Sequence, residues 1–395
     1  MTLPLHHLHA DWTAALVRET HAHGGLAPLD LERFWADQAH ASSAPFNPAC
    51  PQLPLGVLMS WDCVFDELGV PEDRWRFLND QVWACALKKT YNDKAERIVG
   101  RRLLDETPLD PARCYPPYKS LPDIFEMKST WESGSWWLHQ AAHTEDDLAA
   151  LLDRVDDRDL RTFILPPNWA EEHARLRALG VPPPLYRGQR GPVTFAMSVF
   201  GVENLIFLIM DNPALAARLR DTLLRVMLEI ARLLDEAAGF TPATAPHGFY
   251  FADDNCALLN ADMYAFFGWP ILQGMFARYS PDAGDLRGQH SDSAMGHLLP
   301  LLGRLGMTNV NLGPTLTVSE IRAHLPQAVI YGQLAPFTFS RNEEHAMLLE
   351  LFRDAAMAQA ARGVVFSTAG SINNGSRLTG MRLLMAGIQR HCAWR

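Results

Sequence analysis

The sequence predicts an α/β fold, a single (β/α)8 barrel of the TIM type with an N-terminal helical extension. Short β-type runs alternate with amphipathic helical segments, and several runs are apolar throughout, as in a buried parallel sheet. Eight such runs occur, at residues 55–61, 161–165, 193–199, 248–252, 286–290, 308–312, 329–332 and 364–367. No GxGxxG or GxxxxGK[ST] motif follows any of them, which disfavours the alternative of a doubly wound nucleotide-binding sheet.

The helical segments are recognised by apolar residues at a 3.6-residue spacing. The clearest covers residues 212–236, where Leu and Ile form one stripe and Arg, Asp and Glu form the opposite face. Two helices are expected near the N-terminus, at 11–19 and at 30–39 with Asp30 as N-cap. The same pattern recurs later, at residues 294–305, 319–324 and 343–361.

These elements predict two parts of the chain. Residues 1–53 form an N-terminal helical segment whose end, 41–54, is a proline-rich linker. Residues 54–395 form the barrel. Within it, residues 66–137 do not follow the alternation of strand and helix, and we interpret this long aromatic stretch as an insertion over one end of the barrel.

Composition limits the classes of protein. Hydrophobic residues make up 48% of the 395 and charged residues 20%, which excludes a disordered chain. The net charge of −10 argues against a broad nucleic-acid-binding surface. The six cysteines form no CxxC pair, so we expect reduced thiols in a cytoplasmic protein. No signal peptide or membrane-spanning segment is expected.

Barrel enzymes carry their chemistry at the C-terminal ends of the strands, so the polar residues at those ends are the candidates. The run 248–252 ends in Asp253 and Asp254, two adjacent carboxylates that need solvent, a metal or hydrogen-bond donors. The simpler interpretation is that one of them caps the next helix. We expect at least one to belong to a catalytic site.

The run 286–290 ends in His290, Ser291 and Asp292. Residues i and i+2 of an extended segment share a face, so His290 and Asp292 are candidates for a metal-binding or acid–base pair. The alternative is a buried structural histidine, with Asp292 as N-cap of a helix from Ala294.

Further candidates would bind substrate. The Gly/Ser/Asn loop after residues 364–367 offers Ser371, Asn373 and Asn374. Loops of this type often bind an anion through backbone N–H groups. The alternative is a plain surface loop. Arg187 and Arg190 are candidates for gripping a carboxylate, with solvated loop residues as the alternative. Gln333 follows the run 329–332 and completes this set.

Four stretches carry a resemblance to a known family: residues 191–201 (GPVTFAMSVFG), 251–270 (FADDNCALLNADMYAFFGWP), 290–306 (HSDSAMGHLLPLLGRLG) and 363–375. In order and spacing they resemble the uroporphyrinogen decarboxylase superfamily, which includes zinc- and corrinoid-linked methyltransferases. The similarity covers roughly residues 120–395. It implies a distorted (β/α)8 barrel with N-terminal helices and a site at the C-terminal strand ends.

The resemblance leaves the branch open. The decarboxylase branch has an Arg-rich N-terminal motif for which Gly100-Arg101-Arg102 is a poor substitute. The methyltransferase branch binds zinc through His-x-Cys and a later Cys. Here the first element is His290-x-Asp292, and the later position falls near Ala369-Gly370. Cys256 is the candidate for a replacement thiolate.

The leading hypothesis is a metal-assisted transfer or removal of a methyl or other one-carbon group on a small polar substrate. A divalent ion, expected to be zinc, would be bound by His290 and Asp292, with Asp253 or Asp254 as third ligand or acid–base. Cys256 would add the replacement thiolate. One alternative is a metal-free decarboxylase in which these aspartates move the proton. Another is a non-catalytic corrinoid- or partner-binding protein. Any corrinoid would come from a separate protein, and the tetrapyrrole decarboxylases suggest a homodimer.

Overall fold

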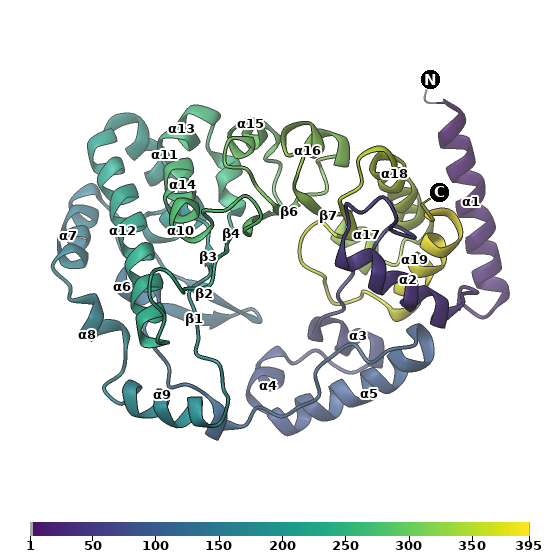
Figure 1. Cartoon of the computed structure of the whole chain (residues 1–395), viewed down its shortest axis with the longest axis horizontal. Coiled ribbons are helices and arrows are strands. Elements are labelled where there is room, and N and C mark those ends of the chain that lie inside the picture. Colours follow the sequence, from purple (N-terminus) through teal and green to yellow (C-terminus); the bar gives the residue numbers. More distant parts are fainter. Residues whose placement is uncertain (1–2, 395) are drawn as a thin grey trace. The chain divides into compact units, whose positions relative to one another are not determined.

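The computed structural model describes residues 3–394, and the side chains from residue 8 onward. It is an α/β structure with one parallel six-stranded sheet in the order β3-β4-β5-β6-β7-β8 and a separate antiparallel pair, β1-β2 (Figure 1). The order of the parallel strands follows the chain, as it does when helices connect successive parallel strands. The chain divides into two compact units, which we describe in turn.

The first unit contains residues 1–108, 291–296 and 309–395. Its strands are β6 (Asn309–Leu312), β7 (Val329–Leu334) and β8 (Val364–Thr368), with Ile330 opposite Val364 and Leu334 opposite Thr368. Figure 1 shows α18 and α19 beside one another, and α18 packs on both β7 and β8. The helices are α1 (Leu3–Ala22), α2 (Leu31–Ser43), α3 (Val64–Leu68), α4 (Arg74–Asn79), α5 (Gln81–Val99), α16 (Val318–His324), α17 (Pro336–Ser340), α18 (Glu344–Ala361) and α19 (Leu378–His391).

The second unit contains residues 109–290 and 297–308. Its parallel strands are β3 (Gly188–Arg190), β4 (Phe249–Ala252) and β5 (Arg287–Ser291), and β1 (Ser129–Glu132) pairs with β2 (Ser135–Leu138). Helices α10 to α14 lie around β3 and β4 in Figure 1. The helices are α6 (Leu121–Ile124), α7 (Glu145–Asp156), α8 (Leu160–Ile164), α9 (Trp169–Ala178), α10 (Pro192–Phe200), α11 (Val202–Asp211), α12 (Pro213–Ala237), α13 (Ala261–Phe266), α14 (Gly268–Tyr279) and α15 (Leu299–Gly303).

Five of the eight predicted strands are confirmed, as β4 to β8, with small shifts of their ends. Two predictions were wrong, because residues 161–165 and 193–199 lie in helices α8 and α10. Nearly every residue of α10 is buried, so its helix has no polar face and its sequence looks like a buried strand. The strand of that region is instead β3, which ends just before the proline that opens α10.

The prediction of a strand at residues 55–61 was also wrong in extent. Leu55 forms one isolated parallel bridge with Phe366 of β8, and Gly56 N–H donates to the Phe366 carbonyl at 2.7 Å. The chain then turns into the short 3-10 helix Trp61–Cys63. Among the described residues the parallel sheet has six strands, which confirms the α/β class; the closed eight-stranded barrel stays a prediction.

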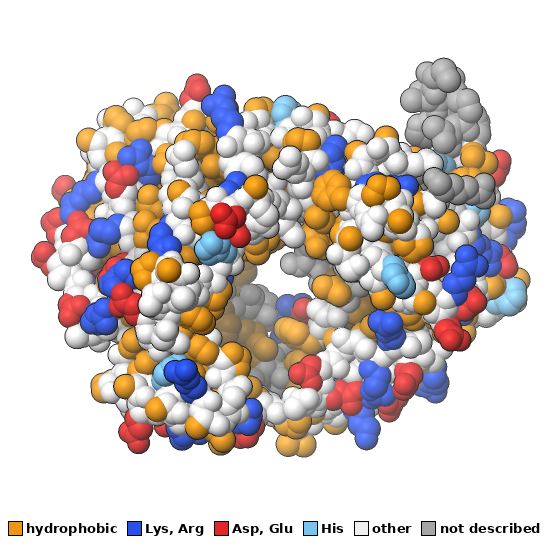
Figure 2. Space-filling model, viewed as in Figure 1, with side chains coloured by type: hydrophobic (Ala, Val, Ile, Leu, Met, Phe, Trp, Pro, Cys, Tyr) orange, Lys and Arg blue, Asp and Glu red, His pale blue; other side chains and the backbone are white. Residues whose placement is uncertain are grey.

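The helix predictions fared better. Asp30 is the N-cap of α2 and accepts a hydrogen bond from the Arg33 N–H at 3.1 Å. The segment 212–236 forms α12, with Asn212 as N-cap. On the outer surface, Arg218 and Arg225 of α12 pair with Asp156 of α7, and Figure 2 shows acidic and basic side chains interspersed at the left of the view.

The N-terminal and insertion regions are largely helical. Segment 66–137 contributes α4, α5, α6 and the β1-β2 hairpin, and its expected place over a barrel end stays a prediction, as does the division at residues 53 and 54. Among the described residues, no single helix has the length and apolar composition to cross a membrane. Helices α10 and α11 have that length and composition only when taken together, and the pair is bent by 101°.

Candidate functional site

The candidate site begins at the C-terminal ends of three neighbouring strands. Arg190 of β3 lies opposite Ala252 of β4, which lies opposite His290 of β5. The ladder continues one step further, because the Gly191 N–H donates to the Ala252 carbonyl and the Asp253 N–H to the His290 carbonyl. Residues just past these positions therefore emerge together at one edge of the sheet.

Asp253 is fully buried and anchors this edge. Its Oδ1 accepts a hydrogen bond from the Thr194 N–H at 2.8 Å, in the first turn of α10, where a carboxylate is favoured. Burial nevertheless raises the pKa of Asp253 to about 6. Asp253 stands at the N-cap position of the 3-10 helix Asp254–Leu258, yet its side chain makes no capping bond there. The expected alternative of a simple helix cap is therefore wrong for this carboxylate.

Asp254 and His290 approach one another at the mouth of this edge. His290 Nε2 lies 3.7 Å from Asp254 Oδ1, and their side chains are 20% and 39% exposed. Asp292 comes two residues after His290, at the end of β5. One ligand atom each from Asp254, His290 and Asp292 can be chosen so that all lie within 4.8 Å of one another. This is the spacing expected of side chains that share one metal ion.

Asp292 is not the N-cap of a helix from Ala294, because no helix begins there. Residues Gly296–Leu298 form a 3-10 turn, and α15 starts at Leu299 with Leu298 in the cap position. Asp292 packs instead against glycines that follow two strands. A Cβ on Gly370 would lie 3.2 Å from the Asp292 Cβ, and one on Gly313 would lie 2.7 Å from the Asp292 carbonyl oxygen.

Cys256, the predicted replacement thiolate, does not join this group. Its Sγ is fully buried and accepts a long contact from Gln289 Nε2 at 3.8 Å. Gln289 and His290 are successive residues of β5, so their side chains point to opposite faces. Cys256 therefore lies with the face of β5 opposite His290, and we leave it out of the proposed ligand set.

The structure separates the two predicted arginines. Arg190 is the last residue of β3, is exposed, and donates to Ser198 Oγ at 3.0 Å. Arg187 precedes β3, at the opposite end of the strand. Its guanidinium lies 2.6 Å from the buried Asp235 and 4.5 Å from the centre of the Tyr279 ring. Arg187 thus has a structural role, which replaces the expected role in substrate binding.

Two more predicted substrate-binding residues are engaged in the fold. Gln333 is fully buried, and its Nε2 donates to three backbone carbonyls. Asn374 accepts a hydrogen bond from the Asp66 N–H and donates to Glu72, so it ties the loop after β8 to the segment around α3. Ser371 is exposed and Asn373 half-buried in the same loop. For these two, a role in substrate binding stays a prediction.

The sequence did not identify the residues that pack against the Asp253 carboxylate. A Cβ on Gly191 would lie 2.1 Å from the Asp253 Cβ, so only glycine fits. Three atoms of the same buried region have no hydrogen-bond partner among the described residues: Asp253 Oδ2, Tyr264 Oη and Gln289 Oε1. The Gly-Pro pair at 191–192, which marks a helix start, was the available signal for this packing.

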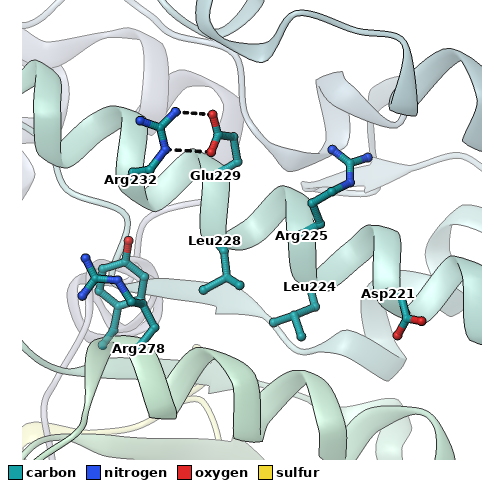
Figure 3. A pocket seen from close by; sticks show the side chains of 8 residues that line it. Asp221, Leu224, Arg225, Leu228, Glu229, Arg232 and Arg278 are labelled. Atoms are coloured by element: carbon teal, nitrogen blue, oxygen red, sulfur yellow. Dashed lines mark hydrogen bonds and ion pairs between the residues drawn. The ribbon is translucent and has the colours of Figure 1, made fainter. Parts of the chain in front are cut away.

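Two other features lie away from these strand ends. His247 Nδ1 is 3.0 Å from Asp285 Oδ2 and 3.5 Å from Asp282 Oδ2, and these residues precede β4 and β5. A groove of about 540 Å³ runs along α12 and α14 (Figure 3). In this groove Arg232 pairs with Glu229. The backbone carbonyl of Tyr279, another groove residue, accepts a hydrogen bond from the Gly248 N–H just before β4. Neither feature contains a residue of the predicted site.

Comparisons with known proteins support the fold. No family model matches this chain, and no curated protein matches it. Among solved structures, a methyltransferase from Methanosarcina mazei matches with a TM-score of 0.51 and 15% sequence identity, over 89% of this chain and 96% of that chain. The protein is therefore an α/β protein whose fold is shared with that methyltransferase. At this identity the likeness concerns the fold.

Proposed function

We propose that this chain is an enzyme with a uroporphyrinogen-decarboxylase-like barrel that transfers or removes a methyl or other one-carbon group on a small polar substrate, assisted by a divalent metal ion. The observation that carries the proposal is the grouping of Asp254, His290 and Asp292 within 4.8 Å. All three residues were candidates from sequence alone, His290 and Asp292 as metal ligands and Asp254 as a third ligand or acid–base. The shared fold with a solved methyltransferase agrees with this class of reaction.

The donor set fits a divalent cation. One imidazole nitrogen and two carboxylate oxygens suit zinc, and two negative charges balance the charge of the ion. The side chains of Asp254 and His290 are partly exposed, so a substrate can reach an ion bound there. When bound, such an ion supplies a Lewis acid and a template. Because the set has carboxylates and no thiolate, it favours substrates that coordinate through oxygen or nitrogen.

Arg190 would bind the anionic part of that substrate. It occupies the same register as His290, with β4 between them. Strands lie about 4.8 Å apart, so the two Cα atoms are separated by roughly 10 Å. A guanidinium binds carboxylate, sulfonate or phosphate oxygens. The substrate class is then a small anion whose reacting end lies at Asp254, His290 and Asp292.

Asp253 would act behind this site, by holding the turn that carries Asp254. Its hydrogen bond from Thr194 joins the end of β4 to the start of α10. Thr194 Oγ1 in turn accepts the Asn255 N–H at 2.9 Å. These bonds fix the backbone on both sides of Asp254. If the methyl group comes from a corrinoid, that corrinoid would be carried by a separate protein.

The test is metal content of the purified protein, with a His290→Ala/Asp292→Ala double variant. We expect about one divalent ion per chain in the wild type and its loss in the double variant. His247→Ala is the matched control, because it removes a histidine from the other His–Asp group of the described residues. A wild type that stays metal-free after incubation with zinc would overturn the proposal. It would favour a metal-free decarboxylase, to be examined by screening carboxylated substrates for carbon dioxide release.

A further inference from the structure

Gln333, at the end of β7, has its side chain aimed into the protein. Its Nε2 donates to the carbonyls of Leu312, Gly313 and Leu316 at 2.8, 2.9 and 2.8 Å. Three carbonyl oxygens around one atom identify it as the amide nitrogen, since an oxygen there would be repelled. One side chain thereby holds the whole loop that follows β6, residues 312–316.

This loop touches the backbone of Asp292. A Cβ on Gly313 would lie 2.7 Å from the Asp292 carbonyl oxygen, closer than real Cβ contacts, and 3.0 Å from that of Ser293. Gly370 approaches the side chain of Asp292. A Cβ on Gly370 would lie 3.2 Å from the Asp292 Cβ and 3.6 Å from its Oδ2. Asp292 is therefore held between two glycines, and a displacement of the Gly313 loop is transmitted to it directly.

Gln333 is itself fixed from α18. Its backbone N–H donates to Asp354 Oδ2 at 3.1 Å, and Asp354 is fully buried. Arg353 Nε lies 2.8 Å from the other carboxylate oxygen, and its Nη2 donates to the Gln333 carbonyl at 3.4 Å. This ion pair is half-buried, because Asp354 is fully buried and the Arg353 side chain is 37% exposed. Here it fixes the residue that holds the loop.

We propose that Gln333 is a positioning residue for Asp292, which acts through the 312–316 loop and sets the place of the Asp292 carboxylate. The inference rests on the proposed function in that Asp292 is there a metal ligand. It replaces the expected contact of Gln333 with substrate by an indirect role. Such supporting residues, when substituted, typically weaken metal binding by about 10- to 100-fold.

The test uses Gln333→Glu, which keeps the size of the side chain and places a carboxylate against three carbonyls. Asn92→Asp is the matched control, because Asn92 is also fully buried in the same unit and its Nδ2 donates to the Leu104 carbonyl at 2.7 Å. Hydrogen exchange of the metal-free proteins is measured first. We expect at least about tenfold faster exchange at 312–316 and at 291–295 in Gln333→Glu, and unchanged exchange there in Asn92→Asp.

The second measurement is Co²⁺ titration followed by visible absorption. Gln333→Glu is expected to raise the Kd for Co²⁺ at least about tenfold and to alter the spectrum, whereas Asn92→Asp leaves both unchanged. Exchange that speeds up at 312–316 but not at 291–295 would overturn the inference. If Gln333→Glu does not fold, Gly313→Ala is used with the same expectations. If the wild type binds no Co²⁺, the proposed function fails, while hydrogen exchange still decides the inference.

Discussion

Gly191 lies against Asp253 so closely that a Cβ on Gly191 would be 2.1 Å from the Asp253 Cβ and 2.6 Å from its Oδ1. The two residues directly follow the neighbouring strands β3 and β4, and the Gly191 N–H donates to the Ala252 carbonyl. This packing lets the first turn of α10 reach the buried carboxylate. The position of Asp254, the next residue, depends on it.

We first predict that Gly191→Ala destabilises the protein by about 3 kcal/mol, because the added methyl overlaps backbone-anchored atoms that cannot move aside. Urea denaturation measures this change. Gly284→Ala in the same unit is the control, because no heavy atom lies within 4 Å of its added Cβ. Its free energy of unfolding should change by less than about 0.5 kcal/mol. Equal effects of the two substitutions would contradict the packing described here.

The second prediction concerns pH. The pKa of Asp253 is raised from 3.8 to about 6, mainly by burial, so the folded state binds this proton more tightly than the unfolded state. Between these values the wild type therefore loses stability as pH rises. Asparagine does not titrate. The stability of Asp253→Asn relative to wild type should rise by about 2 kcal/mol from pH 4.5 to pH 7, in urea unfolding with EDTA present.

Asp147→Asn is the control for that experiment. The hydrogen bond with Thr144 holds the pKa of Asp147 below its usual value. Its contribution to stability is thus present above the unfolded pKa and is lost only as pH falls through the lower folded pKa. The difference between Asp147→Asn and wild type should stay nearly constant from pH 4.5 to pH 7. A flat profile for Asp253→Asn as well would show that Asp253 titrates normally.

The third prediction separates the two arginines. Arg187→Met leaves the buried Asp235 without its partner, and we expect a loss of about 3–5 kcal/mol in the free energy of unfolding. Arg190→Met removes an exposed side chain and should cost less than about 0.5 kcal/mol. With an anionic substrate, Arg190→Met should raise KM. Destabilisation by both substitutions to the same degree would argue against this division of roles.

The fourth prediction concerns the ligand set. Asp254→Ala should weaken metal binding at least about tenfold, because it removes one of three charged or imidazole donors. Cys256→Ala should keep the metal content of the wild type and lose about 1 kcal/mol of stability, because it leaves a small cavity in the core. Metal analysis after dialysis gives both results. Loss of metal in Cys256→Ala would restore the thiolate to the ligand set.

The candidate site was partly predictable from the sequence. Asp254, His290 and Asp292 lie at or just past the ends of two predicted strands, and parallel strands bring such ends to one edge. The neighbouring Asp253 was a candidate for the same reason, but its burial was not predictable. Adjacent residues at a strand end point in different directions, and local pattern does not say which one faces the interior.

The fold shows the same limit. Helix α12 was predictable because it keeps a polar face. Helix α10 was not, since burial on all sides removes the period that distinguishes a helix from a buried strand. Its flanking glycine and proline were the better signal.

The sequence by itself determined the α/β class, five of the six parallel strands, and the carboxylates and histidine at the ends of two of them. Only the tertiary structure decided the use of each polar side chain: Arg187 pairs with Asp235, Gln333 holds a loop, and Cys256 turns away from His290. The reason is physical. Alternation and helical period are set by contacts a few residues apart. The partner of a buried charge or amide lies far along the chain, at a place that only the packed structure fixes.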